Sequence, residues 1–466
     1  MTEKDKVKKL EKDLLWKAPH VATCSDGGKQ QKSAEKFCEG YKQFLNKAKT
    51  ERECSSEIVS ILAKAGYKPF DAKKKYKAGD KVYYVNRGKA VIATTWGMKS
   101  IDEGVRLVAS HIDSPRLDIK PTPLYEEGEM SLLKTHYYGG IKKYQWAAVP
   151  LSMHGVIFKG DGKAVELNVG EDPDDPIFYI SDILPHLSYK QNEKRAADAI
   201  EAEQLNVVIG SWRFECDDVK NPFKLYAMNI LNEKYGITEK DFVRAEIEMV
   251  PAMKARDVGF DRSMIAAYGH DDKVCAYPSL MAELETVKPE YTTVSVFTDK
   301  EEIGSEGNTG LNSGYLYDYI CRLADNKKAD SKDVFAHTKA LSADVSSVYD
   351  PDFSEQFDKH NISYLNHGPV LEKYTGARGK SSASDANAEF LAEVSLLLDK
   401  AGVHWQTGEL GAVDKGGGGT VAKYLAAHNM EVVDFGTPVL SMHAPYELVT
   451  KTDVYNTYLG CRAFLA

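Results

Sequence analysis

Histidines and carboxylates follow several apolar, strand-like runs of this chain, each at the point where the run ends. The runs are GVRLVAS, TTVSVFT, KALSA and TPVLSM, and an acidic pair precedes a helical run in GHDDKVCAY. The side chains concerned are His111, Asp113, Asp271, Asp272, Asp299, Glu301, Glu302, Asp344 and His443. Ligands of open α/β sheets bind outside the carboxyl ends of the strands, so we expect these side chains to meet. Clustered carboxylates cannot all ionise without a cation, and the set therefore predicts a metal site.

The ligand types indicate which metal, and how many ions. Imidazole and carboxylate without thiolate suit zinc, cobalt or manganese. Five candidates are too many for one tetrahedral catalytic zinc, but they fit two metals if one carboxylate bridges them. The candidates are His111, Asp271, Glu302, Asp344 and His443. Spacing alone leaves open whether Asp271 or the adjacent Asp272 is the bridge.

Two neighbouring residues are predicted to support the metals. Asp113 stands two residues after His111, where it can accept the second imidazole N–H and fix the tautomer. In the pair Glu301-Glu302 the side chains diverge, so one can bind metal while the other faces the attacking water. Glu301 is thus the candidate general base. The alternative is that the pair only caps a helix before GSEGNTG.

The elements that must position these residues can be read from the periodicity of the chain. The first quarter predicts helices, with a capping box at Thr50 and Glu53 and a stop at Gly66. A hairpin is expected over residues 82–96. From residue 258 onward, short apolar runs alternate with helical ones, which is typical of a mainly parallel sheet covered by helices.

A different pattern fills the middle of the chain. After Pro115, short strand-like runs alternate with turn residues such as those of PTPLYEEGE, and RAEIEMVP closes the segment. The predicted fold is therefore α/β, with a mainly parallel-sheet domain of residues 1–115 and 258–466 interrupted by a β-rich domain of residues 116–257.

Composition excludes other classes of protein. The 466 residues carry a net charge of -9, which argues against a nucleic-acid partner. No apolar run is long enough to span a membrane and the N-terminus lacks a signal sequence, so a cytoplasmic protein without a membrane partner is expected. The seven cysteines form no CxxC pair, which predicts reduced, mostly buried thiols rather than a Cys-based zinc site.

Several blocks resemble the aspartyl aminopeptidase family of metallopeptidases. They are SHIDSPRLDIKP, GHDDKVCAY, TDKEEIGSEGNTG, SADVSSVYDP, VDKGGGGTVAKYLA and SMHAPYELVTKTDVY, in order from about residue 30 to the C-terminus. The resemblance implies a dizinc aminopeptidase that cleaves the N-terminal residue from peptides, acidic or neutral, and whose β-rich domain builds a homo-oligomer, a tetrahedral dodecamer.

The resemblance also implies a role for each ligand. Asp271 becomes the bridging carboxylate, His111 and Asp344 hold one metal, and Glu302 and His443 hold the other. Glu301 becomes the general base. Asp272 stands where relatives often have Asn, which indicates a supporting role rather than direct ligation.

Weaker signals concern the substrate. SDILPHLSYKQ resembles the family segment whose histidine reaches a neighbouring subunit, which makes His186 a candidate; the alternative is a structural role. Arg378 and Lys380 are candidate partners for an acidic substrate side chain, and solvated loop cations are the alternative. The glycines of residues 416–419 are expected to line the substrate pocket rather than to bind a nucleotide.

Two other functions remain open at this point. A dimetal N-acyl amide deacylase would use similar ligands but would act on blocked amines. An inactive structural assembly protein would keep the fold without needing both a base and a metal pair.

Overall fold

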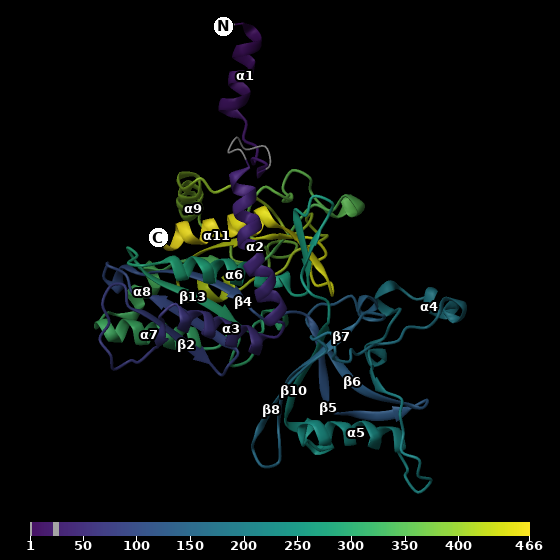
Figure 1. The fold of residues 1–466 in the computed structure, drawn as a ribbon. Helices are drawn as coiled ribbons and strands as arrows, with labels where there is room; N and C mark the ends of the chain where they lie inside the picture. The colour runs from purple at the N-terminus through teal and green to yellow at the C-terminus, as the bar shows by residue number, and fades with distance from the viewer. Residues whose placement is uncertain (1, 22–27) are drawn as a thin grey trace.

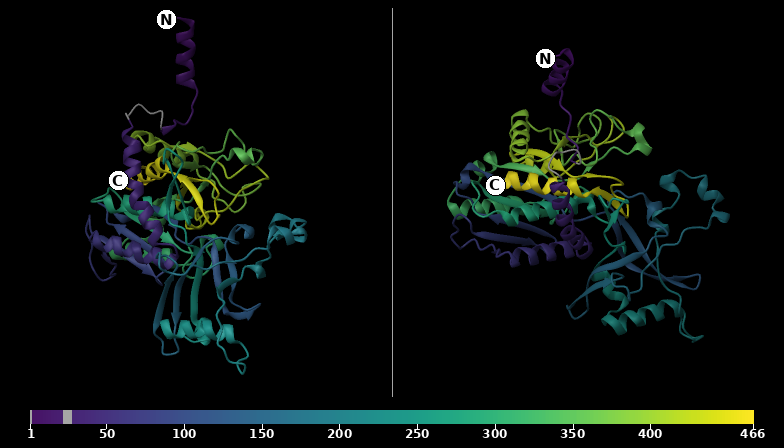
Figure 2. Two further views of the ribbon diagram at one scale, coloured as in Figure 1. Left: turned by 45° about the vertical axis from the view of Figure 1, so that its right-hand side comes forward. Right: turned by 45° about the horizontal axis from the view of Figure 1, so that its top comes forward.

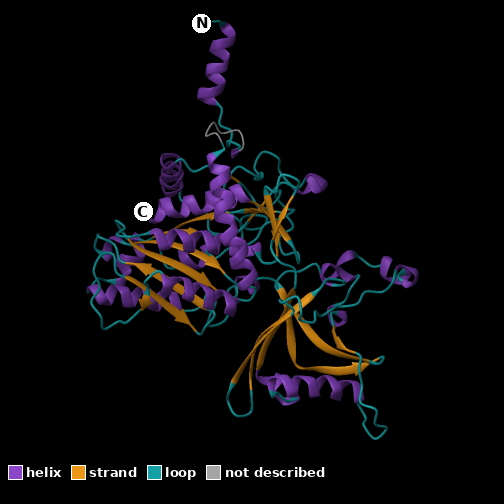
Figure 3. Cartoon of the chain, viewed as in Figure 1, coloured by secondary structure: helices purple, strands orange, loops and turns teal. Residues whose placement is uncertain are grey.

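The computed structural model of the chain describes residues 2–21 and 28–466. Two large sheets organise it: a nine-stranded sheet between layers of helices, and a six-stranded sheet with one long helix against it (Figure 1, Figure 3). The first helix, α1 (Glu3–Leu14), stands clear of both and buries none of its residues. The predicted α/β class is confirmed.

The nine-stranded sheet carries the strands that precede the predicted metal ligands. The four central strands β13, β4, β14 and β18 run parallel and are largely buried on both faces, as strands covered on two sides must be. In sheet order the strands are β1 (Lys68–Pro69), β2 (Lys81–Asn86), β3 (Ala90–Thr95), β13 (Thr292–Thr298), β4 (Val105–His111), β14 (Lys339–Ser342), β18 (Glu431–Gly436), β16 (Val370–Glu372) and β17 (Gln406–Thr407).

Helices cover both faces of this sheet (Figure 2). Successive residues of a strand point to opposite faces, and Val108 belongs to one core cluster while Leu107 and Ala109 belong to the other. On the face of Val108 lie α2 (Lys29–Lys47), α3 (Glu51–Lys64), α6 (His270–Glu285), α9 (Ala388–Ala401) and α11 (Lys451–Leu465). On the other face lie α7 (Tyr315–Lys327), α8 (Ser331–His337) and α10 (Ala422–Ala426).

Local sequence signals set several of these elements. The Thr50 side chain accepts a hydrogen bond from the backbone N–H of Glu53, and the Glu53 carboxylate accepts one from the backbone N–H of Thr50, so the predicted capping box is confirmed. Gly66 follows the last turn of α3 with φ of 91°, where glycine fits best. The hairpin of β2 and β3 is also confirmed.

One predicted strand forms, but outside the large sheet. The run TPVLSM does not join the large sheet, because β18 already occupies that position and Pro438 has no N–H to donate to a ladder. Its two-residue strand β19 (Pro438–Val439) pairs instead with β15 (Ser346–Ser347). Nearby, β20 (Glu447–Thr450) joins β11 (Arg256–Val258) and β12 (Met264–Ala267) in a three-stranded sheet.

The six-stranded sheet is antiparallel along its whole order and has its own apolar core. Its strands are, in sheet order, β8 (Ala164–Val169), β7 (Leu151–Phe158), β10 (Ala245–Pro251), β5 (Arg116–Glu127), β6 (Met130–Tyr138) and β9 (Val207–Gly210). The helix α5 (Pro222–Tyr235), which the sequence did not predict, packs against it, and the short α4 (Tyr189–Asn192) lies further out (Figure 1). All six strands fall inside residues 116–257, whose exact limits as a domain stay a prediction.

A buried ion network joins the two sheets. Arg116 begins β5, is 5% exposed, and places Nη1 3.4 Å from Glu51 Oε2 on α3 and Nε 3.3 Å from Glu248 Oε2 on β10. Lys89 Nζ lies 3.1 Å from Glu51 Oε1. Burial opposes ionisation of Glu51, yet Arg116 and Lys89 hold the pKa of its carboxyl well below its usual range. Arg116 of the six-stranded sheet and Glu51 of α3 are thus buried as charged groups because each compensates the charge of the other.

No helix in the described part of the chain is long and apolar enough to cross a bilayer. The cysteines described are free thiols, and Cys38, Cys54, Cys275 and Cys461 are buried. Cys24 lies outside the described residues.

This network generates a stability prediction. Arg116→Met should lower the free energy of unfolding by about 3–5 kcal/mol, because Glu51 and Glu248 then stay buried with less opposing charge. Guanidinium unfolding curves measure the change. The control is Arg195→Met, whose partner Asp198 is exposed and which should change stability by no more than about 0.5 kcal/mol. Equal midpoints for the two variants would contradict the network's role.

Candidate metal centre

The carboxyl ends of the central strands bring the predicted ligands together. His111 is the last residue of β4, and Asp344 lies just beyond the neighbouring strand β14. Glu301 and Glu302 begin the short 3-10 helix Glu301–Ile303, which follows β13. Parallel register aligns Thr298 at the end of β13 with His111, so these loops start at the same edge of the sheet.

The remaining two ligands come from other elements. Asp271 lies in the first turn of α6, where its backbone is not yet helical. His443 lies in the connection between β19 and β20, with φ of 65°, an uncommon value for a residue with a side chain.

The five predicted ligands form one cluster, with Asp271 in its middle. Its Oδ1 lies 3.0 Å from His111 Nε2, and its Oδ2 lies 3.2 Å from His443 Nε2. On the first side, His111 Nε2 is also 3.6 Å from Asp344 Oδ1. On the second side, His443 Nε2 is 3.5 Å from Glu302 Oε2. One carboxylate is therefore shared between two pairs, each made of an imidazole and a further carboxylate.

Electrostatics within the cluster are unbalanced without added positive charge. Burial, followed by the charge of Asp271, raises the pKa of Glu302 well above its ordinary value, and burial also raises that of Asp344. Burial alone would lower the pKa of His443, but Asp271 and Glu302 outweigh it and raise this pKa to about 11. In the absence of metal, protons on the imidazoles would compensate the carboxylates, a task that a metal ion performs when it binds.

The donor set fits divalent metal ions. Ligand atoms of His111, Asp271 and Glu302 all lie within 4.8 Å of one another, and so do those of His111, Glu301 and Asp344. Glu302 Oε1 is buried without a hydrogen-bond partner, which is costly for a carboxylate oxygen unless a cation satisfies it.

Glu301 lies beside the first pair. It belongs to the donor group of His111 and Asp344. Burial, followed by the charge of Asp344, raises the pKa of its carboxyl to about 8. A carboxylate with such a raised pKa is a stronger base than an exposed one, as proton transfer near neutral pH requires.

Asp113 supports the cluster through more contacts than its spacing predicted. His111 Nδ1 lies 3.0 Å from the backbone oxygen of Asp113 and 3.3 Å from its Oδ1, so Nε2 points toward Asp271. The same carboxylate accepts hydrogen bonds from the backbone N–H groups of Glu301 and Glu302, both at 3.2 Å, and from the Tyr138 hydroxyl at 2.8 Å. Asp113 therefore fixes both an imidazole and the glutamate pair.

Asp272 turns away from the second side of the cluster. Its Oδ2 accepts a hydrogen bond from the backbone N–H of His111 at 3.2 Å, while Oδ1 is buried without a partner. Its ligand atom also lies within 4.8 Å of those of Asp271 and Asp344. The choice of bridge between the two aspartates stays a prediction, although only Asp271 reaches both imidazoles.

Sequence reasoning missed Glu447. This residue is 1% exposed at the start of β20, and its carboxylate accepts hydrogen bonds from the backbone N–H groups of His443 at 2.8 Å and Asp271 at 3.1 Å. It links the segments of two ligands that are distant in sequence. The available signal was a lone Glu in the strand-like run ELVT, next to the block that holds His443.

The glycine pair after β6 was also missed as part of the site. His443 Nδ1 donates a hydrogen bond to the Gly140 backbone oxygen at 2.8 Å, which leaves Nε2 facing Asp271. A Cβ on Gly139, whose φ is 76°, would lie 3.1 Å from Glu302 Oε2. The segment that follows β6 therefore packs directly on the predicted metal ligands.

A cavity of about 440 Å³ opens over the cluster. Glu301, Glu302 and Asp344 line it on one side, and glycines 417–419 line it on another. Three of the four glycines thus border this cavity, whereas Gly416 lines a neighbouring space, and a role of the run in binding substrate stays a prediction. The other titratable residues that line the cavity include Asp271, Glu372, Lys423 and His443.

The three predicted substrate-binding residues lie outside the lining of this cavity. Arg378 and Lys380 border a separate space of about 40 Å³. Lys380 Nζ lies 2.9 Å from Asp385 Oδ2 and 3.8 Å from the ring centre of Tyr374. His186 is exposed in the short helix Pro185–Leu187 of the six-stranded-sheet region. A substrate role for any of them stays a prediction.

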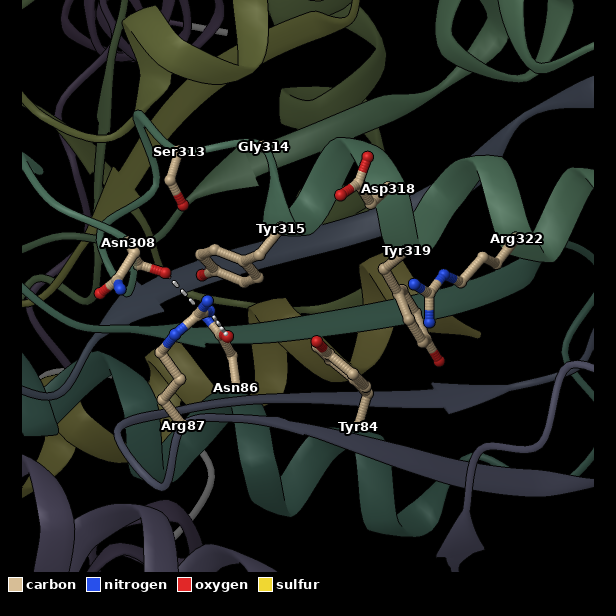
Figure 4. A pocket seen from close by; sticks show the side chains of 10 residues that line it. All are labelled: Tyr84, Asn86, Arg87, Asn308, Ser313, Gly314, Tyr315, Asp318, Tyr319 and Arg322. Carbon is tan, nitrogen blue, oxygen red and sulfur yellow. Dashed lines mark hydrogen bonds between the residues drawn. The ribbon is translucent and has the colours of Figure 1, made fainter.

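Another cavity, of about 330 Å³, lies between β2 and α7 (Figure 4). Arg87 Nη1 donates to Asn86 Oδ1 at 2.8 Å, and Asn86 Nδ2 donates to the Asn308 backbone oxygen at 2.9 Å. Figure 4 shows Asp318 on α7, apart from this group. The residues that line this cavity include one carboxylate and no histidine, so they do not offer a donor set like that of the first.

Comparisons with known proteins identify the family of the chain. The profile of a family described as Aminopeptidase I zinc metalloprotease (M18) matches residues 44–465. A probable M18 family aminopeptidase 1 of Clostridium acetobutylicum is 47% identical over 445 residues, which cover 94% of this chain and 96% of that protein. The crystal structure of an M18-family aminopeptidase from Thermotoga maritima superposes with a TM-score of 0.91 at 41% identity, covering 97% of this chain and 99% of that one.

A more distant structure shares the fold. The Saccharomyces cerevisiae mApe1 dodecamer matches with a TM-score of 0.73 at 20% identity, covering 93% of this chain and 96% of that one. The family profile, the bacterial relative and the bacterial structure together confirm the resemblance carried by the sequence blocks. The chain therefore belongs to the M18, or aspartyl aminopeptidase, family of zinc metalloproteases.

Proposed function

We propose that this zinc aminopeptidase family member removes the N-terminal residue of peptides by two-metal hydrolysis with Glu301 as general base. The observation that carries the proposal is the position of Asp271, whose two oxygens face His111 and His443 at 3.0 and 3.2 Å. A carboxylate between two imidazoles, each with its own further carboxylate, matches the ligand requirement of a metal pair.

In this proposal His111 and Asp344 hold one metal, Glu302 and His443 hold the other, and Asp271 bridges them. Zinc is the metal of the family, and cobalt or manganese would suit the same donors. Metal bound there supplies a Lewis acid for the scissile carbonyl and lowers the pKa of the attacking water.

The protein's own groups orient the reaction and move the proton. Glu301 takes the proton of the attacking water on its carboxylate and gives it to the leaving amine. Asp113 holds the backbone N–H groups of both glutamates, so the base and the neighbouring ligand keep a fixed relation. The cavity walls limit access to the end of a peptide, and the surrounding carboxylates attract the free α-amino group.

The two alternative functions have less support. A deacylase must accept a blocked, uncharged amine, yet Glu301, Glu302, Asp344 and Glu372 line the cavity with negative charge. An inactive assembly protein has no need to bring a base and five ligands together around buried, unpartnered carboxylate oxygens.

Assembly into a homo-oligomer, specifically a tetrahedral dodecamer, is part of the proposal. The six-stranded-sheet region exposes apolar side chains at Leu184, Leu187, Tyr189 and Trp212. Such a surface is typical of a protein interface. The relative mApe1 is a dodecamer, which supports the same state here. A cytoplasmic location stays a prediction.

The proposed preference for particular N-terminal residues of the substrate has less support than the proposed reaction. The resemblance predicts acidic and neutral N-terminal residues, with Arg378 or Lys380 as the partner of an acidic side chain. Lys380 already pairs with Asp385, and both cations line a different cavity.

Glu301→Gln should lower kcat by about 10²- to 10⁴-fold, because the proton shuttle is lost. Both metals should remain bound, since the variant keeps every proposed ligand. Steady-state kinetics with aminoacyl p-nitroanilides and metal analysis of the purified variant test this. Glu302→Gln is the matched control, which should lose metal as well as activity. An active Glu301→Gln enzyme would exclude the proposed base.

Asp271→Asn should lower the metal content of both sites, because the bridge contacts both imidazoles. Asp344→Asn should mainly empty one site. Metal content per chain after dialysis distinguishes the two results. If Asp272→Asn empties both sites while Asp271→Asn leaves them full, the assignment of the two aspartates is reversed.

A role of His186 across subunits predicts complementation. His186→Ala and Glu301→Gln proteins should each be poorly active, and mixing them under conditions that exchange subunits should restore part of the activity. Mixing Glu301→Gln with itself under the same conditions is the control. Mixed assemblies that stay inactive, although native mass spectrometry shows exchange, would contradict a contribution from a neighbouring subunit.

A further inference from the structure

One carboxylate in the cavity wall takes no part in the metal cluster. Glu372 is the last residue of β16 and is 4% exposed, and it lines the same cavity as Glu301 and His443. Its Oε1 accepts a hydrogen bond from Ser346 Oγ at 2.6 Å. Among the residues that the structure describes, no Lys, Arg or His forms an ion pair with it within 4.0 Å.

The surroundings of Glu372 add negative charge rather than compensate it. Asp434 is its partner in the β16–β18 ladder and is also 4% exposed. Burial, together with the charges of Asp434 and Asp344 and against the effect of the Ser346 hydroxyl, raises the pKa of Glu372 to about 8. A buried carboxylate without a cation is costly, so a cationic group arriving in the cavity gains a strong partner.

Glu372 is nevertheless close to the proposed metal ligands. Ser346, its hydrogen-bond partner, stands two residues after the proposed ligand Asp344, and Val345 between them lines the cavity. Glu372 belongs to none of the donor groups that fit a metal ion in the described part of the chain. Its carboxylate is therefore available to a part of the substrate rather than to the metals.

We propose that Glu372 recognises the cationic side chain of an N-terminal lysine or arginine, which makes this protein an aminopeptidase with a preference for basic residues. The inference rests on the proposed aminopeptidase function and names the substrate class of the same cavity. The side chain of such a residue ends in N–H donors that match a carboxylate acceptor, and the bond is charge-assisted.

Two other charged groups offer competing explanations. Lys423 is the cation in the lining of the cavity, and it would favour an acidic side chain if it set the preference. The α-amino group of the substrate is also cationic, and Glu372 would then contribute equally to every substrate. The two explanations and the proposal predict different rankings of substrates.

The test compares lysine with norleucine, whose side chain is that of lysine without the ammonium group. Zinc-loaded wild-type protein, Glu372→Gln, Asp434→Asn and Lys423→Met are assayed with the p-nitroanilides of Lys, Arg, norleucine and Glu. Asp434→Asn is the matched control, because Asp434 is an equally buried neighbour outside the cavity lining. Calorimetry of lysinamide and norleucinamide with metal-free protein adds a measurement that does not depend on turnover.

We expect wild-type protein to prefer Lys and Arg over norleucine. Glu372→Gln should lower kcat/KM for Lys by about 10- to 100-fold, the value of one charge-assisted hydrogen bond, and should leave norleucine nearly unchanged. Asp434→Asn should keep the wild-type ranking. Lysinamide should bind wild-type protein more tightly than norleucinamide does, and this difference should disappear in Glu372→Gln.

Three results would overturn the inference. They are an equal loss for all substrates in Glu372→Gln, a wild-type preference for Glu that Lys423→Met abolishes, and equal binding of the two amides. If wild-type protein hydrolyses none of the four substrates, the proposed function fails instead, and the calorimetry still decides the role of Glu372.

Discussion

The mutual repulsion of buried carboxylates at one edge of a parallel sheet is the constraint on which the rest of this structure depends. Ligand atoms of Asp271 lie within 4.8 Å of those of Glu302 and of Asp344, and little of these three side chains is exposed. Burial lowers the pKa of both imidazoles, but the neighbouring carboxylates outweigh it and raise both pKa values, so protons on the imidazoles would compensate this charge in the absence of metal. Metal ions provide the same compensation without protons and leave the imidazoles neutral, which is the form that binds metal.

Orientation of the imidazoles requires both large sheets. Each histidine presents Nε2 to Asp271 because a backbone oxygen lies near its Nδ1: that of Asp113 for His111 and that of Gly140 for His443. Gly140 and Tyr138, whose hydroxyl holds Asp113, both follow or end β6 of the six-stranded sheet. The inserted sheet is therefore part of the candidate metal centre as well as a candidate assembly surface.

The strands of the large sheet and most of the predicted ligands could be predicted, because they depend on local sequence patterns. Apolar runs locate the strands, parallel strands align their carboxyl ends, and ligands such as His111 and Asp344 follow directly. Glu447 was not predictable in the same way, since its role depends on a fold that brings β20 beside the start of α6. The strand predicted before His443 lies outside the large sheet, because a sequence run does not show which position in that sheet another strand already occupies.

The position of Arg378 and Lys380 shows a second limit of sequence reasoning. Their proximity in sequence to a helix near the site suggested that they reach the substrate. The loop that carries them is instead held against the glycine run, since the Gly376 N–H donates to the Gly418 backbone oxygen at 2.6 Å. A Cβ on Gly417 would lie 2.3 Å from the Gly376 oxygen, so only glycine permits this approach. The contact leaves both cations in the space behind the glycine run, whereas Glu372 lies in the wall of the main cavity.

Metal binding and the junction between the sheets are linked by the same contacts. A ligand that binds only the folded arrangement stabilises it in proportion to its affinity. The arrangement proposed to bind metal includes Gly140 on His443 and Tyr138 on Asp113, so the energy of metal binding there would also stabilise the packing of the inserted segment on the proposed ligands. The buried pair of Arg116 and Glu51 stabilises the same junction independently of metal. The interface that buries the ion network thus also supplies contacts to the proposed metal ligands.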